Sequence, residues 1–285
     1  MKDIVVGCIT GYTFDKIKPW VNSLDRCGFD GVKAMICYNV DYETVEELVK
    51  RQYTVLAFGK NDNLKKFEYK ENFSIVVERF LHLWYFFKKF QGQYRYIVST
   101  DVKDVIFQTN PSEWLEKNMN DAQINVACES IRYKDEDWGN HNLFKAFGPL
   151  VHDHNQNNLI YNAGTVSGKF DTMLDFFLNV YMMCNGTSHF TEGGGGPDQA
   201  AVNILLNMKP YRDITRFTAS EEGWAAQLGT TGDPTKASQF GPVLLEEKPK
   251  LENGVVTTSK GEEFYIVHQY DRVPSMRKAL EEKFA

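Results

Sequence analysis

Short β-branched runs alternate with helical segments through the amino-terminal part of this chain. We expect strands at Ile4–Ile9, Val32–Tyr38 and Tyr53–Phe58, separated by helices at Phe14–Cys27 and Tyr42–Arg51. Strands that alternate with helices of this length indicate βαβ units and a parallel sheet. Because ligands bind at the carboxyl ends of the strands in such sheets, residues that follow a strand are the first candidates for a site.

The rest of the chain continues as an α/β pattern. The expected elements are helices at Ser74–Phe90, Phe170–Met183, Asp198–Asn207 and from Pro274, with strands at Tyr94–Ser99, Gln123–Cys128 and Phe264–Val267. The helix at Ser74–Phe90 is apolar almost all round and should be deeply packed. The polar stretch from Asn140 to Asn158 is expected to form a loop, Gly193–Gly196 a hinge, and Thr230 to Gly261 a looser excursion. We see no repeat or linker, so we expect one domain.

Composition excludes several classes of protein. The chain has 285 residues, of which 42% are hydrophobic, so it can bury a core and is not expected to be disordered. A net charge of −6 argues against a sequence-independent nucleic-acid binder. The five scattered cysteines form no CxxC pair, which favours a reducing compartment. No apolar run is long enough for a signal peptide or a membrane span, and we expect a soluble cytoplasmic protein.

Two carboxylates follow the expected strand at Tyr94–Ser99. Asp101 and Asp104 lie directly after it and precede a second apolar run, Val105-Ile-Phe107. A carboxylate pair at the end of a central strand suits Mg²⁺ or Mn²⁺, which complete their coordination with phosphate oxygens of a substrate. The alternative is a turn whose aspartates cap the next segment.

This segment resembles the Asp-x-Asp signature of GT-A glycosyltransferases, which transfer a sugar from a nucleotide diphosphate to an acceptor hydroxyl. Its wording is also similar to that of soluble glycosyltransferases of large algal viruses. The spacing departs from the family pattern, because Asp101 and Asp104 are one residue further apart than usual. The resemblance implies that Asp104 binds the metal and that Asp101 lies towards the ribose or binds the metal through water. The reverse assignment stays open.

Three later segments resemble the same family and occur in its order. Asn162-Ala163-Gly164 is similar to the stretch that lines the donor sugar, and Asp198-Gln199 to the pair near the reacting carbon. His268 follows a late strand, where many family members supply a third metal ligand. Each has a structural alternative: a turn for the first, a favourable interaction with a helix dipole for the second, and a buried structural histidine for the third.

Two further sites are expected to contact the donor. Arg79 lies within the most apolar helix, where an unpaired guanidinium would be costly, so it should extend to solvent or meet a carboxylate or phosphate. The family resemblance implies that its partner is either the donor or the carboxylate of Asp101. By family resemblance, nucleotide binding begins at Thr10, Gly11 and Tyr12, where the tyrosine ring is suited to stack on the base.

The resemblance implies a single GT-A domain over residues 1–285, with a Rossmann-like, mostly parallel sheet flanked by helices. Residues 1–108 would form the nucleotide-binding half, and residues 109–285 the acceptor side. The implied cofactor is Mn²⁺ or Mg²⁺, the donor a UDP- or GDP-sugar, and the acceptor a glycan or glycoprotein. The motifs favour a retaining reaction with Asp198 near the anomeric carbon. A general base would instead make the enzyme inverting; the candidates are Glu129, Glu192, Glu221 and Glu222.

Three other functions remain to be weighed. His152-Asp153-His154 could serve a metal hydrolase if that segment were a strand, with both histidines on one face. A sugar-nucleotide pyrophosphorylase would need a basic, glycine-rich loop after the first strand, and this chain has no basic residues there. The third alternative is a carbohydrate-binding protein with a GT-A fold and no catalytic activity.

Overall fold

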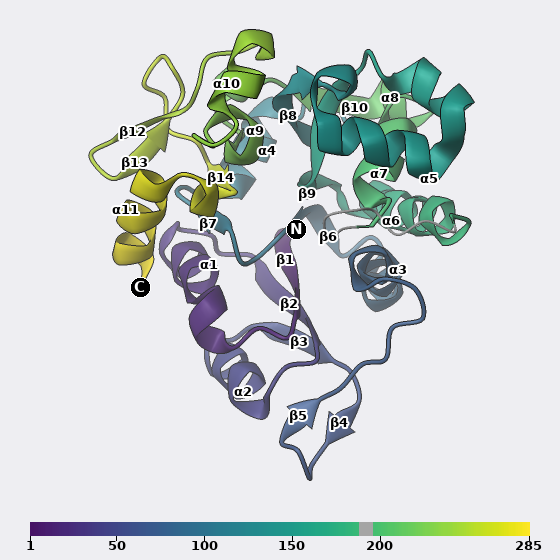
Figure 1. Cartoon of the computed structure of the whole chain (residues 1–285). Helices are drawn as coiled ribbons and strands as arrows, with labels where there is room; N and C mark the ends of the chain where they lie inside the picture. Colours follow the sequence, from purple (N-terminus) through teal and green to yellow (C-terminus); the bar gives the residue numbers. More distant parts are fainter. Residues whose placement is uncertain (188–195) are drawn as a thin grey trace.

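A seven-stranded sheet runs through the molecule (Figure 1). The computed structural model describes residues 1–187 and 196–285. The strand order is β10 (Thr215–Thr218), β8 (Ile124–Arg132), β9 (Leu159–Lys169), β6 (Tyr94–Thr100), β1 (Lys2–Thr10), β2 (Val32–Tyr38) and β3 (Thr54–Ala57). β9 is antiparallel to both of its neighbours, and the other pairs are parallel. The expected α/β fold with a mostly parallel sheet is confirmed.

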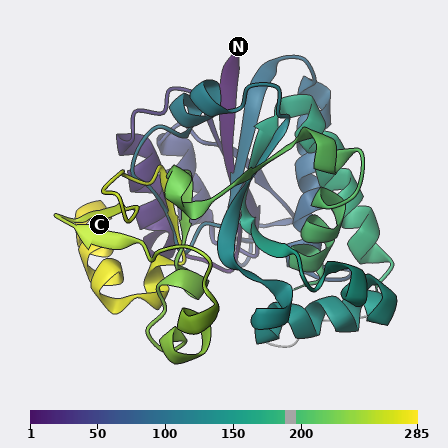
Figure 2. The same cartoon turned by 90° about the horizontal axis from the view of Figure 1, so that it is seen from above.

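Helices cover both faces of the sheet, as the view from above shows (Figure 2). The two faces follow from the period-2 alternation of each strand: Ile4 and Val6 of β1 face one core, and Val5 and Ile9 face the other. One core contains side chains of α1 (Phe14–Arg26), α2 (Tyr42–Lys50) and α4 (Pro111–Asn118); the other contains those of α3 (Ile75–Phe87), α6 (Phe170–Asn185) and α7 (Asp198–Leu206).

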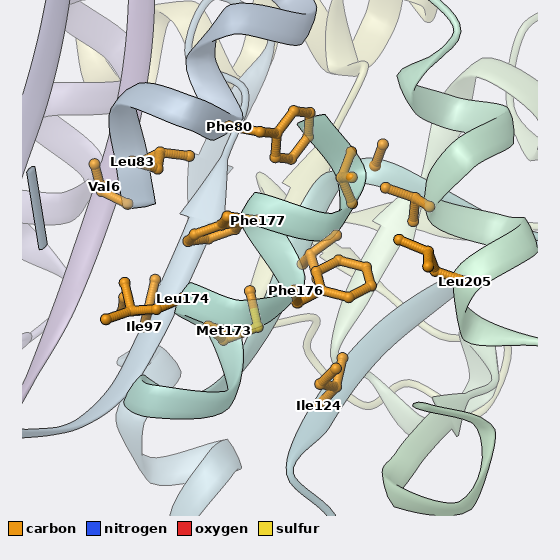
Figure 3. Packing of buried hydrophobic residues seen from close by; sticks show 14 of the residues in the cluster. Val6, Phe80, Leu83, Ile97, Ile124, Met173, Leu174, Phe176, Phe177 and Leu205 are labelled. Atoms are coloured by element: carbon orange, nitrogen blue, oxygen red, sulfur yellow. The ribbon is translucent and has the colours of Figure 1, made fainter. Parts of the chain in front are cut away.

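The second core is dense in aromatic and branched side chains (Figure 3). Phe80 of α3 and Phe177 of α6 pack with ring centroids 6.0 Å apart, and Val6 and Ile97 of the sheet lie beneath the helices. This contact explains the apolar character of α3. The helix was expected to be deeply packed, and Val77, Phe80 and Leu83 are buried, whereas Tyr85 on its outer face is 61% exposed.

A small three-stranded sheet brings the carboxyl-terminal segment to the main sheet. It has the order β11 (Ala225–Gln227), β14 (Ile266–His268) and β7 (Val105–Phe107), and α11 (Pro274–Phe284) packs on it. β14 is antiparallel to β7, with His268 opposite Val105. The Gln269 backbone N–H donates to the carbonyl of Asp104 over 2.7 Å. This pairing places a histidine from the end of the chain beside the carboxylates that follow β6.

The remaining strands and α-helices are short, apart from α5 (Asp137–Asn155). They are two hairpins, β4 (Lys60–Asn61) with β5 (Lys66–Phe67) and β12 (Lys250–Glu252) with β13 (Val255–Thr257), and three one-turn helices, α8 (Tyr211–Ile214), α9 (Leu228–Thr231) and α10 (Ala237–Phe240). The stretch from Thr230 to Gly261 therefore contains more regular structure than expected. Gly193–Gly195 of the expected hinge lies outside the described residues. None of the described helices combines the length and apolar character that a membrane span requires.

The loop expected from Asn140 to Asn158 is a helix, and that prediction was wrong. The helix α5 begins after Glu136, whose carboxylate accepts the Gly139 N–H, and it bends at Gly148, which has a φ of 77°. Leu143 and Phe147 are four residues apart in the stretch before Gly148, and they pack on one core with Val151 of the stretch after it. The many Asn, Gln and His residues around them hid this spacing.

The helix also removes the geometry that the hydrolase alternative needed. His152 and His154 are two positions apart on α5, so their side chains point to different sides instead of one. The Nε2 atom of His152 contacts the side-chain oxygen of Asn140 at 2.8 Å.

Candidate active site

Two adjoining pockets lie at the carboxyl ends of β1 and β6. The first, of about 270 Å³, is lined by Thr10, Tyr12 and Tyr38 among others. The second, of about 460 Å³, extends towards α5, α7 and α9. The two share Arg79, Asp101 and Asp104, which therefore stand between them. Gly11 forms the turn beneath the first pocket, with a φ of 66° and its N–H donating to the carbonyl of Tyr38.

Asp101, Asp104 and His268 form a compact group between the pockets. One ligand atom of each lies within 4.8 Å of the others, and no second group of this kind occurs among residues 1–187 and 196–285. The Nε2 atom of His268 is 3.6 Å from Asp101 Oδ2 and 3.8 Å from Asp104 Oδ1. These separations are too long for hydrogen bonds and leave room for a cation between the three side chains.

The electrostatics of the three groups are interdependent. Burial alone would raise the pKa of Asp101, but Arg79 and then His268 outweigh it and bring that pKa below its usual range. Burial raises the pKa of Asp104. The pKa of His268 is also raised, because the carboxylates of Asp104 and Asp101 outweigh the opposing effect of burial. The buried imidazole thus acts on both carboxylates, and the guanidinium of Arg79 acts on that of Asp101.

Gly164 is needed for the position of Asp101. The Asp101 N–H donates to the Gly164 carbonyl over 2.8 Å, so the two residues lie in contact at the end of β6. A Cβ atom on residue 164 would lie 2.5 Å from Asp101 Oδ2 and 2.9 Å from Asn162 Oδ1. Every other side chain would therefore push the carboxylate away. The segment Asn162–Gly164 is part of β9, so the alternative that it is a turn was wrong.

Arg79 bridges two carboxylates. Its guanidinium donates to Asp101 Oδ1 over 2.6 Å and to Asp198 Oδ2 over 3.1 Å. The pairing with Asp101 was one of the two expectations from the sequence, and the pairing with Asp198 was not expected. Burial raises the pKa of Asp198, and the opposing effect of Arg79 is smaller. The guanidinium therefore connects the end of β6 to the start of α7.

Asn162 and Gln199 converge on a buried glutamate. The side-chain N–H groups of Asn162 and Gln199 donate to Glu129 Oε1 over 2.7 and 3.2 Å. Gln199 also accepts the Ala163 N–H over 2.7 Å. Glu129 lies where the register of β8 shifts, next to Ser130 with a φ of 58°, and this irregularity turns it into the second pocket.

The fold of this chain is similar to that of solved glycosyltransferases. The chain is similar to the glycosyltransferase GlyE of Streptococcus pneumoniae TIGR4, with a TM-score of 0.54 and 12% identity over 94% of this chain and 54% of that one. It is also similar to the apo structure of WbbM, a bifunctional glycosyltransferase, with a TM-score of 0.55 and 11% identity over 98% of this chain and 51% of that one. The chain has a glycosyltransferase fold. It spans about half the length of these two proteins. No family model and no curated protein matches the sequence.

Within this glycosyltransferase fold, the residues predicted to bind the donor or a metal, or to lie near the reacting carbon, all lie at the two pockets or in the turn beneath the first. Lys103 and Arg272, which were not predicted, also line the cleft. Their positions in the sequence could have identified them, because Lys103 lies between the two aspartates and Arg272 lies four residues after His268. Trp138 and Lys236, at the start of α5 and before α10, line the far end of the second pocket.

The four candidate general bases differ in their surroundings. Glu129 lines the second pocket, whereas Glu221 binds the Ser259 hydroxyl and Glu222 pairs with Arg216. Glu192 lies outside the described residues. Burial, followed by the charge of Glu136, raises the pKa of Glu129 to about 7. Glu129 is the described candidate that both faces the pocket and titrates near neutral pH.

Glu129→Gln is expected to change how stability depends on pH. The unfolded chain ionises Glu129 near its ordinary pKa of 4.5, and the folded chain keeps the proton until about pH 7. The folded state binds more protons in this window, so wild-type stability falls as the pH rises through it. The variant lacks this loss and should be more stable at pH 8 by about 3–4 kcal/mol, at roughly 1.4 kcal/mol for each pKa unit between 4.5 and about 7.

Urea unfolding at pH 4 and pH 8 measures this difference. We expect the two proteins to be similar at pH 4 and the variant to be more stable at pH 8. Glutamine keeps an oxygen for the amides of Asn162 and Gln199, so the contacts around residue 129 persist. Equal pH dependence of both proteins would mean that Glu129 ionises normally.

Proposed function

We propose that this chain transfers a sugar from a UDP- or GDP-linked donor to a hydroxyl of a glycan or glycoprotein acceptor. The observation that carries the proposal is the group Asp101, Asp104 and His268 between two pockets. One pocket is suited to a nucleotide and the other to a sugar and its acceptor. The glycosyltransferase fold supports the same reading.

The three side chains fit a hard divalent cation. Two carboxylate oxygens and one imidazole nitrogen within 4.8 Å of one another are a donor set that Mn²⁺ or Mg²⁺ accepts. Asp104 and His268 would hold it directly, with Asp101 as a third ligand or as one that acts through water. When bound, such a cation neutralises charge that develops on the leaving diphosphate.

The pocket residues suggest where the donor lies. Thr10 and Tyr12 offer hydroxyl groups and an aromatic ring for the base and ribose in the first pocket. Lys103 and Arg272 offer positive charge near the two aspartates, where a diphosphate would lie. Apart from Arg272, these residues lie within 1–108, which supports the proposal that this segment forms the nucleotide-binding half.

The second pocket supplies the groups for the sugar. Asn162, Glu129 and Gln199 present amides and a carboxyl group that can bind sugar hydroxyls. Asp198 and Gln199 would lie near the anomeric carbon, as a retaining reaction requires. Trp138 and Lys236 would line the acceptor side.

The pKa of Glu129 favours a second version of the mechanism. A carboxyl group with a pKa near 7 in the pocket is suited to take a proton from an acceptor hydroxyl. That role would make the reaction inverting. NMR of the first-formed product separates the versions: the donor's anomeric configuration is kept in a retaining reaction and changed in an inverting one.

A thermal-shift screen tests the proposed function. We expect UDP or GDP with Mn²⁺ to raise the melting temperature, because a ligand that binds only the folded state adds about 2.7 kcal/mol at a hundredfold excess over its Kd. Mn²⁺ and nucleotide should each have a smaller effect alone. Catalysis is then tested by hydrolysis of a UDP- or GDP-sugar, measured as the release of the free sugar. Binding without turnover would favour the non-catalytic alternative, and no binding would overturn the proposal.

A further inference from the structure

A chain of two buried hydrogen bonds leads away from His268. Its Nδ1 atom lies 2.8 Å from Gln227 Oε1, and Gln227 Nε2 donates to Thr165 Oγ1 over 2.7 Å. The exposed fractions are 2% for His268 and 0% for both Gln227 and Thr165. Solvent therefore does not compete with these contacts, and each polar atom in the chain depends on its protein partner.

The direction of these bonds determines which ring nitrogen carries the proton. An amide oxygen can only accept, so the contact with Gln227 Oε1 requires an N–H at Nδ1 of His268. In the neutral ring, Nε2 then carries the lone pair. Nε2 is the atom that faces Asp101 and Asp104, at 3.6 and 3.8 Å. The ring thus presents a ligand atom to the group of carboxylates.

The three residues come from two sheets. Gln227 is opposite His268 in the parallel pair of β11 and β14, and Thr165 is opposite Thr100 in the pair of β9 and β6. The hydrogen bond between Gln227 and Thr165 therefore ties the small sheet to the main sheet. It does so next to the turn that carries Asp101, so it also fixes the distance between the imidazole and the carboxylates.

We propose that Gln227 and Thr165 are positioning residues, which hold His268 in the tautomer and orientation that bind a divalent cation through Nε2. This inference rests on the proposed metal-dependent function. Partners that bind the second nitrogen of a ligating histidine commonly change metal affinity by about 10- to 100-fold when they are removed. The reverse orientation of the amide would place an N–H against Nδ1, put the ring proton on Nε2 and block the ligand atom.

Titration of the full chain with Mn²⁺ tests the proposal. The electron paramagnetic resonance signal of the free ion measures how much Mn²⁺ stays unbound. Gln227→Leu removes the acceptor and should weaken Mn²⁺ binding by about 10- to 100-fold. Gln227→Glu keeps an acceptor for Nδ1–H, and the Thr165 hydroxyl can donate to it, so this variant should bind Mn²⁺ at least as tightly as wild type. Thr165→Val frees the amide to turn and should weaken binding less than Gln227→Leu. Gln239→Leu is the matched control, because Gln239 binds exposed Asp137 on the surface.

The possible results test the positioning role separately from the proposed metal-dependent function on which it rests. Wild-type binding of Mn²⁺ together with equal binding by Gln227→Leu overturns the positioning role alone. Binding by Gln227→Glu that is as weak as that of Gln227→Leu overturns the acceptor role. If Gln227→Leu does not fold by circular dichroism, Gln227→Glu and Thr165→Val decide. A wild-type chain that binds no Mn²⁺, with or without UDP or GDP, overturns the proposed metal site and this inference with it.

Discussion

Asp104→Asn should lose Mn²⁺-dependent stabilisation by nucleotide and about a thousandfold in the rate of sugar transfer. The magnitude follows because a metal ion contributes several kcal/mol to the stabilisation of charge in such a reaction, and each 1.4 kcal/mol is about tenfold in rate. Asparagine has nearly the shape of aspartate but no charge, so it removes the ligand with little change in packing. Thermal shifts with Mn²⁺ and UDP or GDP measure the first effect, and donor hydrolysis measures the second.

The metal-free Asp104→Asn variant should fold as well as wild type. Burial raises the pKa of Asp104, so ionisation of this residue costs stability above its ordinary pKa, and a neutral amide avoids that cost. Asp153→Asn is the matched control, since Asp153 is exposed on α5 and belongs to the rejected hydrolase segment. Nucleotide binding by Asp104→Asn that still requires Mn²⁺ would place the metal elsewhere.

The sequence predicted the parts of this molecule that depend on local pattern. The limits of β2 agree with the expected strand, and the two aspartates follow β6 as the spacing indicated. A strand and its following turn are set by adjacent residues, so both can be inferred without knowledge of the fold. The position of His268 beside the two aspartates depends instead on the antiparallel pairing of β14 with β7. Only family resemblance suggested it in advance.

Other features required long-range structure. Glu129 enters the pocket because β8 changes register beside it, and nothing in the local sequence specifies that irregularity. Arg79 was expected to need a negative partner unless it reached solvent, and Asp101 was named as that partner from the family resemblance. Asp198 was missed as the second partner because it reaches Arg79 from α7. The helix α5 was missed because its polar residues outnumber the apolar ones that pack.

Arg79→Met is expected to cause the largest loss of stability. Methionine fills much of the same space but leaves the carboxylates of Asp101 and Asp198 without their shared cation. Removal of one partner from a buried ion pair costs about 3–5 kcal/mol, because the remaining charge stays desolvated. For a chain of this size we expect a fall in melting temperature on the order of 10 °C. Scanning calorimetry of the metal-free protein measures it.

Two further variants identify burial as the cause. Arg51→Met also removes an arginine with two carboxylate partners, Asp25 and Glu47, but the Arg51 side chain is 30% exposed and that of Arg79 is 15% exposed. Ion pairs that water reaches more freely are worth less, about 0–1 kcal/mol when fully exposed, so this variant should melt closer to wild type than Arg79→Met does. Arg79→Met combined with Asp198→Asn should recover part of the loss, because the second change removes one uncompensated charge. If the single Arg79 variant is as mild as Arg51→Met, the two carboxylates do not depend on the guanidinium, and another group must neutralise them.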